Sequence, residues 1–301
     1  MRIARSLSIL LLLAGNAGAA VVVHDDSGVA ITLDQPARRI ISLSPHNTEL
    51  LFAAGAGSHV VAAVEYSDFP HEAKSLPLVG RSAALDIERI AALKPDLVIG
   101  WGSGNPQRQL DAIRRLKIPL FISEPRNIDD IAGTLRRLGS LVGTEDMAER
   151  AAGDFDRRLA DLRKRYSSQP VLTVFYEVWN QPLMTVGGKH VISQIIELCG
   201  GRNVFADNTQ LAPALDTEAV LRANPEVIVA SGMDINRPEW LDEWRRWPAL
   251  RANATDNLYA IPPDLLHRHT PRILDGAQQM CAALESARTR HKKLTTGQAG
   301  K

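Results

Sequence analysis

Apolar residues along the chain fall into short continuous runs that are separated by polar, helix-forming stretches. One such run, residues 97–99, follows a polar stretch that opens at Glu88 and turns at Lys94-Pro-Asp96. A continuous apolar run between turn signals is typical of a strand covered on both faces, as in a parallel sheet. The same pattern returns at 218–231, again with an opening Glu and a Pro-acid turn. The repeat predicts two similar α/β lobes, with a ligand held between them.

The remaining runs extend this alternation over most of the chain. An edge hairpin is expected at 21–31. Further strands are expected at 39–43, 60–64, 118–122, 171–176 and 258–261, and helices at 49–55, 107–116, 128–141, 190–199, 238–247 and 271–287. Strands that alternate with helices predict parallel sheets with crossover helices. The fold class is therefore α/β.

A long helix is predicted between the two halves. Thr144 can cap it, acids follow in its first turn and bases fill its last, as the helix dipole prefers. About 22 residues at 1.5 Å each span roughly 33 Å, enough to bridge two lobes. The expected units are a signal peptide at 1–19, a first lobe at 20–143, a linking helix at 144–167, a second lobe at 168–287 and a polar tail at 288–301.

The first nineteen residues have the form of an export signal. Arg2 and Arg5 precede the apolar run 9–13, and Ala17-Gly-Ala19 resembles a cleavage site. The run is too short to remain as a membrane anchor. Because Lys+Arg is 35 and Asp+Glu is 34, no overall basic field draws in nucleic acid. We expect a soluble exported protein without a nucleic-acid partner.

The chain has two cysteines, Cys199 and Cys281. In an oxidising compartment such a pair is expected to form a disulfide, and two buried thiols are the alternative. A metal-binding role is disfavoured because no C-x-x-C spacing occurs.

Sequence motifs for enzymatic chemistry are missing. The turn after the first body strand, 44–49, contains no glycine, so a dinucleotide fingerprint is not formed there. No P-loop and no G-x-S-x-G elbow occur. Metal binding is also disfavoured, because Arg268 separates two of the candidate histidines and a cation repels a bound metal ion. The candidates considered are His46, His71, His267, His269 and Asp264.

Aromatic residues follow several predicted strands at their carboxyl ends, where open α/β sheets bind ligands. They are Tyr66, Trp101 and Trp179. Taken singly, each is as consistent with ordinary core packing, but together they indicate a wall for a large planar ligand. Asp264 and Arg268 follow the last strand and can hydrogen-bond polar groups of such a ligand, with a surface ion pair as the alternative.

Glu88 and Glu218 open equivalent helices, one in each lobe. Favourable interaction with the helix dipole accounts for an acid at this position. A second interpretation is that two matched carboxylates meet matched bases on a symmetric partner, such as the two subunits of a transporter.

With these residues in view, the chain resembles the periplasmic cobalamin-binding proteins of ABC importers, within the helical-backbone class III of substrate-binding proteins. The resemblance covers about 39–284, nearly all of the exported part. It is specific in five blocks, which are 41–50, 66–70, 88–101, 198–201 and 264–272.

The resemblance implies two Rossmann-like lobes joined by one long helix, with cobalamin between them. It places a disulfide at Cys199 and Cys281, and permease docking at Glu88 and Glu218. Family ligand contacts fall on Tyr66, Trp101, Asp264, Leu265, Leu266, His267 and Arg268, and Trp179 is our own addition to this set. The chain departs from the family pattern at Ser82 and Ala212, where the family has tryptophan, and at 265–267, where it has Trp-Phe and an acid.

The expected function is therefore that of a monomeric periplasmic receptor that carries cobalamin to the permease dimer of an inner-membrane ABC importer. It needs no catalytic residues, no resident cofactor and no structural metal. A haem or ferric-siderophore receptor of the same class remains an alternative. An exported enzyme with a two-lobed α/β fold is the alternative from another class.

Overall fold

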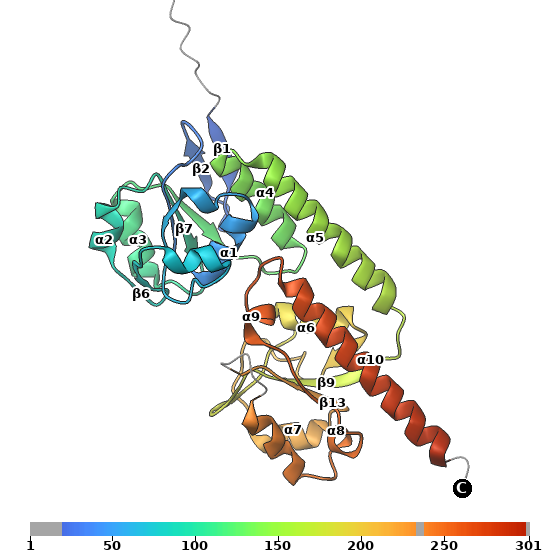
Figure 1. Cartoon of the computed structure of the whole chain (residues 1–301). Coiled ribbons are helices and arrows are strands. Elements are labelled where there is room, and N and C mark those ends of the chain that lie inside the picture. Colours follow the sequence, from blue (N-terminus) through green and yellow to red (C-terminus); the bar gives the residue numbers. More distant parts are fainter. Residues whose placement is uncertain (1–19, 233–237, 299–301) are drawn as a thin grey trace, which may run out of the picture.

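The protein is described by a computed structural model covering residues 20–232 and 238–298, with side chains as far as residue 293. Two α/β units are joined by one long helix (Figure 1). The predicted export signal at 1–19 lies outside the described residues. Within the described ranges, no helix combines the length and the apolar character needed to cross a bilayer.

A four-stranded parallel sheet forms the centre of the first lobe among the described residues. Its strands, in spatial order, are β4 (Val60–Ala62), β3 (Ile40–Ser42), β7 (Leu97–Trp101) and β8 (Leu120–Ser123). Ile40 lies beside Leu97 and Ile41 beside Val98 in the pairing of β3 with β7. All of these side chains are buried, because helices cover both faces of the sheet. This arrangement explains the continuous apolar runs in the sequence.

Helices and short strands complete the first lobe. On one face of the sheet lie α1 (Pro45–Ala53) and α4 (Asp130–Val142), and on the other lie α2 (Ile87–Ala92) and α3 (Gln107–Arg115). The hairpin expected near the N-terminus is present and packs on α4. The peripheral elements are β1 (Val21–His24), β2 (Ala30–Leu33), η1 (Gly57–His59), η2 (His71–Ser75), β5 (Gly80–Arg81) and β6 (Ala84–Leu85).

The second lobe repeats this plan. Its parallel strands, in spatial order, are β12 (Gly201–Asn203), β9 (Leu172–Glu177), β13 (Val227–Ala230) and β14 (Leu258–Ala260). In both described sheets the strands follow the order second-first-third-fourth along the chain. The other elements are β10 (Trp179–Asn180), β11 (Leu183–Met184), α6 (Val191–Leu198), α7 (Thr217–Ala223), η3 (Glu239–Arg246), α8 (Arg251–Ala254), α9 (Pro263–Leu266) and α10 (Ile273–Gln298).

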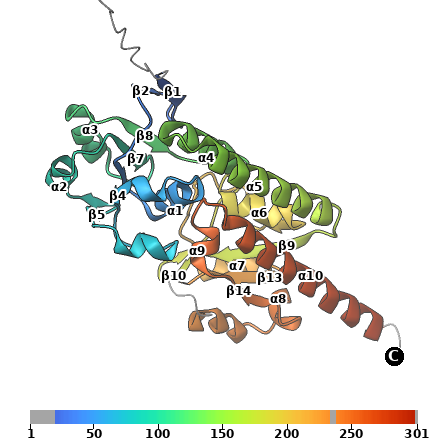
Figure 2. The same ribbon diagram turned by 45° about the horizontal axis from the view of Figure 1, so that its top comes forward.

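Helix α5 (Glu145–Tyr166) connects the lobes and packs against elements of both (Figures 1 and 2). It contacts α1 and α4 of the first lobe and α6 and α10 of the second. Its buried face includes Phe155, Leu159 and Leu162. These side chains belong to one apolar cluster that runs from the first sheet to the second. The opposite face of each sheet has a separate cluster of its own, under α2 and α3 in one lobe and under α7, η3 and α8 in the other.

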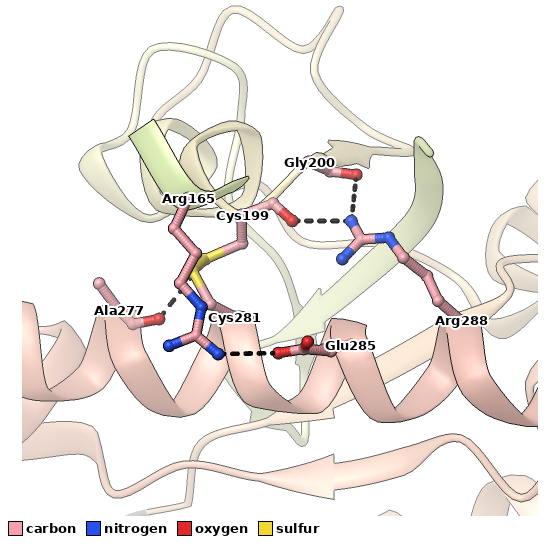
Figure 3. The surroundings of a disulfide bond; sticks show 7 residues. All are labelled: Arg165, Cys199, Gly200, Ala277, Cys281, Glu285 and Arg288. Carbon is pink, nitrogen blue, oxygen red and sulfur yellow. Dashed lines mark hydrogen bonds and ion pairs between the residues drawn. A yellow bond between two sulfur atoms is a disulfide. The ribbon is translucent and has the colours of Figure 1, made fainter. Parts of the chain in front are cut away.

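The predicted disulfide between Cys199 and Cys281 is confirmed, and it ties α6 to α10 (Figure 3). The predicted polar tail needs correction, because α10 continues through 288 to Gln298. Arg288 is buried and donates to the carbonyl groups of Pro170, Cys199 and Gly200. These bonds hold the helix against the second lobe, which composition alone does not reveal.

Two further helix predictions are corrected in detail. The first helix begins at Pro45 rather than at 49, because the Ser44 hydroxyl accepts a hydrogen bond from the Asn47 amide and Pro45 suits the first helical position. The segment predicted as an α-helix at 238–247 is the 3-10 helix η3.

Candidate functional site

A cavity of about 1020 Å³ lies between the lobes. Its volume is at the upper end of the range for ligand pockets, so it suits a large ligand. In each four-stranded sheet the chain order reverses beside the first strand, and such switch points are where open α/β sheets bind ligands. Residues of both lobes line the cavity, among them Asp26, His46, Trp101, Glu124, Pro125, Arg126, Lys189, His190, Ala212, His267 and His269.

The first lobe contributes an indole at the end of β7. Trp101 packs over Gly104, where an added Cβ would lie only 1.9 Å from the indole ring. The Trp101 amide donates to the buried Asn105 side chain, which in turn donates to the carbonyl of Leu43. The ring of His46, at the start of α1, meets the indole edge-on, with 4.9 Å between centroids. The aromatic wall is thus fixed by its own loop and by α1.

The second lobe contributes three imidazoles. The His190 side chain caps α6 and accepts from the Ile192 amide at 3.1 Å. The other two, His267 and His269, follow α9, and Nε2 of His267 lies 3.0 Å from the Tyr176 hydroxyl. The rings of His46 and His190 stand 6.4 Å and 6.3 Å from the ring of His269. Four histidines from both lobes therefore surround one space.

Burial makes these imidazoles neutral. It lowers the pKa of His46 to about 3, with further lowering by the nearby His269 and Arg268. It likewise lowers the pKa of His190 and of His267 to about 4. The pKa of His269 is also lowered by burial, against the opposing effect of the Pro125 carbonyl. At neutral pH the four rings contribute polar nitrogens but no charge.

An interlobe ion cluster, consisting of Glu49, Asp68, Asp264, Arg268 and Arg272, lies beside the cavity. Glu49 of α1 is buried and accepts from Arg268 and Arg272 at 2.7 Å each, and from the Thr270 hydroxyl at 3.0 Å. Arg268 also pairs with Asp68 and Asp264. Since Glu49 and Asp68 belong to the first lobe and both arginines to the second, the cluster holds the lobes together.

The predicted ligand residues divide into two groups. Trp101 and His267 line the cavity. Tyr66, 76% exposed, lies at the ion cluster, where its carbonyl accepts from Arg268. Five other predicted residues also lie outside the cavity wall. The Trp179 indole nitrogen donates to the Gln181 carbonyl, Leu265 is half-buried, and Leu266 belongs to the shared core. Asp264 and Arg268 are members of the ion cluster.

Other predicted positions are placed as follows. Glu88 and Glu218 occupy the same position in α2 and α7, after the capping residues Asp86 and Asp216, and both are exposed. Ala212, where the resembled family has tryptophan, lines the cavity. The missing indole therefore leaves the space wider at that point.

The site contains imidazoles that the sequence did not identify as ligand contacts. The sequence offers His46 and His269 only as ligands for a free metal ion and predicts no role for the His190 side chain. Among the described residues, no group of three or more His, Cys, Asp or Glu side chains is placed to hold such an ion. Only their positions in the sequence could have indicated that these histidines contact the ligand, because His46 follows the carboxyl end of β3 and His190 precedes a helix.

Comparison with known proteins places the chain in a family. The model of the periplasmic binding protein family matches residues 40–265. The chain is 40% identical over 253 residues to a vitamin B12-binding protein of Vibrio cholerae, covering 84% of this chain and 91% of that one.

Solved structures agree. The crystal structure of the periplasmic vitamin B12 binding protein of Vibrio cholerae matches with a TM-score of 0.78 and 39% identity, over 84% of this chain and 98% of that one. A periplasmic haem-binding protein from Roseiflexus matches with a TM-score of 0.73 and 26% identity, over 83% and 99%. The chain therefore belongs to the periplasmic binding protein family.

Proposed function

We propose that this protein captures cobalamin in the interlobe cavity and delivers it to an ABC importer. The observation that carries the proposal is the cavity of about 1020 Å³ with Trp101 on its wall, in a chain 40% identical to a vitamin B12-binding protein. A corrin is large and nearly planar. An indole presents a broad apolar face to such a ring at a low cost in conformational entropy.

The charges around the cavity favour a ligand of low net charge. Its lysine and arginine, Lys189 and Arg126, stand beside two acids, Asp26 and Glu124, of which Asp26 is paired with Arg137, and its imidazoles are neutral. An anionic ferric siderophore calls for several converging bases. Arg268 and Arg272 do not supply them, because both are paired with Glu49.

Haem is the second candidate, and the imidazoles are the observation that favours it. Neutral histidine is a common axial ligand of haem iron. The Roseiflexus relative is a haem-binding protein at 26% identity. Against haem stands the higher identity, 40%, to the vitamin B12-binding protein.

Calorimetry distinguishes these ligands. The exported protein, purified from the periplasm, is titrated separately with cyanocobalamin, haemin and a ferric hydroxamate siderophore. We expect submicromolar binding of cyanocobalamin and at least about 100-fold weaker binding of the other two, a difference of roughly 3 kcal/mol. Submicromolar haemin binding without cobalamin binding would overturn the proposal in favour of the second candidate.

We further propose that the protein works in the periplasm as a soluble monomer, without enzymatic activity and without a resident cofactor. The export signal at 1–19 and membership of the periplasmic binding protein family support this location. The units that we propose are lobes at 20–143 and 168–287 around a linker at 144–167.

Docking to the permease dimer is proposed to use Glu88 and Glu218. Both carboxylates are exposed, and their helices cover the sheet faces that point away from the shared core (Figure 1). Neither carboxylate forms an ion pair within the described part of the chain. They are therefore available to matched basic residues on two symmetric subunits.

Replacement of both glutamates tests this role. Glu88→Ala together with Glu218→Ala is expected to lower cobalamin uptake in cells by about 4- to 25-fold, the product of two exposed ion pairs, while calorimetric affinity for cyanocobalamin stays unchanged. The matched control is Glu145→Ala with Glu239→Ala, because these acids are also exposed in first helical turns. Equal loss of uptake in the control pair, or loss of ligand affinity in the first pair, would refute the docking role.

A further inference from the structure

His269 is held in one defined tautomer. Its Nδ1 lies 2.9 Å from the carbonyl oxygen of Pro125. A carbonyl oxygen can only accept, so Nδ1 carries the proton and Nε2 keeps a lone pair. Nε2 has no hydrogen-bond partner among the described residues and is not one of their occluded, unpartnered atoms. Since His269 lines the cavity, this lone pair is open to a ligand.

The other three imidazoles differ in this respect. His190 accepts through Nδ1 from the Ile192 amide, so its proton lies on Nε2, which can only donate. The Nε2 atoms of His267 and His46 are already paired, with the Tyr176 hydroxyl at 3.0 Å and the Ser44 hydroxyl at 3.2 Å. Of the four rings, His269 alone is fixed by a backbone carbonyl with its second nitrogen free to coordinate.

A free metal ion does not fit this arrangement. Protein sites for a free metal ion such as zinc use three or four protein ligands. Among the described residues, no group of three or more His, Cys, Asp or Glu side chains is placed to hold such an ion. A single donor nitrogen instead suits a metal that arrives with its equatorial positions already filled by a macrocycle.

We infer that Nε2 of His269 is an axial ligand for the metal at the centre of the bound macrocycle, an inference that rests on the proposed function. With a corrinoid that carries water on cobalt(III), the water leaves and the Nε2 lone pair forms the cobalt–nitrogen bond. Cobalt keeps its oxidation state, and no proton moves because Nδ1–H stays on the Pro125 carbonyl. A carbonyl-anchored imidazole is the arrangement that protein metal sites use to orient histidine.

The consequence is selectivity among corrinoids by their axial ligands. Corrinoids with an exchangeable water gain the bond to His269. Cyanocobalamin does not, because cyanide and its own base fill both axial positions.

Diaquocobinamide, which has water on both axial positions, is the test probe. It is titrated into the exported wild-type protein and into the His269→Ala and His190→Asn variants while visible absorption is recorded. His190→Asn removes a cavity imidazole but keeps a good helix cap. We expect wild type and His190→Asn to shift the corrin bands, and His269→Ala to bind with unshifted bands and about 10-fold or more lower affinity.

Parallel titration with cyanocobalamin separates the possible failures. His269→Ala is expected to weaken cyanocobalamin binding less than diaquocobinamide binding, because only diaquocobinamide loses an axial bond. Far-ultraviolet circular dichroism checks that the variant is folded, and His269→Gln replaces it if it is not. Unshifted bands in the wild type, or shifted bands in the His269 variant, would overturn the axial bond while leaving the proposed function intact. Failure of the wild type to bind either corrinoid would overturn the proposed function and this inference with it.

Discussion

In the first lobe, β7 ends at Trp101 on the cavity wall, whereas the equivalent strand of the second lobe, β13, ends at Ala230. Ser231 follows, buried, and donates to the Ile261 carbonyl. Both strands are third along the chain and lie beside the first strand of their sheet. The lobes therefore share a backbone plan but not the side chains at its carboxyl ends. The repeated helix–strand unit gives the two lobes matching outer surfaces, whereas the residues that follow each strand give them different cavity walls.

The two lobes also differ in what they offer a ligand. The first presents an indole with one imidazole against it, and the second presents three imidazoles. A shared apolar core beneath α5 and the ion cluster around Glu49 hold these walls at a fixed distance. Wide opening of the lobes would break both, so we expect a largely preformed cavity rather than a hinged one.

Breaking the contact between the lobes has the largest expected effect. Glu49→Ala leaves Arg272 without its buried partner, whereas Arg268 keeps Asp68 and Asp264. Breaking a buried pair costs about 3–5 kcal/mol of unfolding free energy, and we expect the lower end of that range here. Urea unfolding measures it. Asp154→Ala is the control, because the pair of Asp154 with Arg157 is exposed and worth about 1 kcal/mol or less. If Glu49→Ala lowers the unfolding free energy no more than Asp154→Ala does, the interlobe ion cluster does not hold the lobes together.

Removing the indole tests the wall of the first lobe. Trp101→Ala is expected to weaken cyanocobalamin binding about 30-fold, roughly 2 kcal/mol, as for an aromatic anchor in a buried contact. Trp179→Ala, in the second lobe, is expected to change affinity less than about 3-fold, because Trp179 lies outside the cavity wall. Calorimetry compares the two. A larger loss of affinity in Trp179→Ala than in Trp101→Ala would instead support the sequence-based prediction that Trp179 contacts the ligand.

The pH dependence of stability has opposing contributions from cavity histidines of both lobes and from Glu177 of the second lobe. Folded-state pKa values of about 3 to 4 mean that the unfolded chain binds more protons to His46 and His190 below pH 6.5, so these groups lower stability as pH falls through that range. Glu177 of the second lobe acts oppositely. Burial raises its pKa to about 8 despite a hydrogen bond from Trp244, so it lowers stability as pH rises from about 4.5 to 8.

From these opposing effects we expect the unfolding free energy to peak near pH 6.5–7. Above the peak the decline is at most about 1.4 kcal/mol per pH unit, the effect of one proton. Glu177→Gln keeps an acceptor for Trp244 and is expected to remove this decline. Denaturant unfolding at pH 6.5, 7.25 and 8 measures it. If the unfolding free energy of Glu177→Gln still declines above the peak, the decline belongs to a titrating group other than Glu177.

The fold was largely predictable from the sequence, because strands buried on both faces leave continuous apolar runs. Arg39 to Leu43 and the runs before Trp101 and Ser231 all became central strands. The element ends were less predictable. The start of α1 depended on how the Ser44 cap and Pro45 combine, and the end of α10 on the distant carbonyl groups that hold Arg288.

The site was predictable only where one residue lies next to a strand end, as Trp101 does. The imidazoles come from α1, from the cap of α6 and from the segment after α9, and only the folded chain brings them together. Arg268 shows the complementary case. Its position after the last strand predicts either a ligand contact or an ion pair, and in the structure Glu49, 219 residues earlier in the chain, accepts a hydrogen bond from its guanidinium.

Single replacements of the docking glutamates give the smallest expected effect and test whether the lobes are equivalent outside the cavity. Glu88 and Glu218 occupy the same helical position with the same exposed setting, so Glu88→Gln and Glu218→Gln should lower uptake by the same factor. One exposed ion pair is worth about 0.5–1 kcal/mol, which corresponds to roughly 2- to 5-fold. Cobalamin uptake in cells measures the effect, and calorimetry checks that the affinity for cyanocobalamin is unchanged. A loss confined to one variant would mean that the symmetry of the two lobes ends at their folds and does not extend to the transporter.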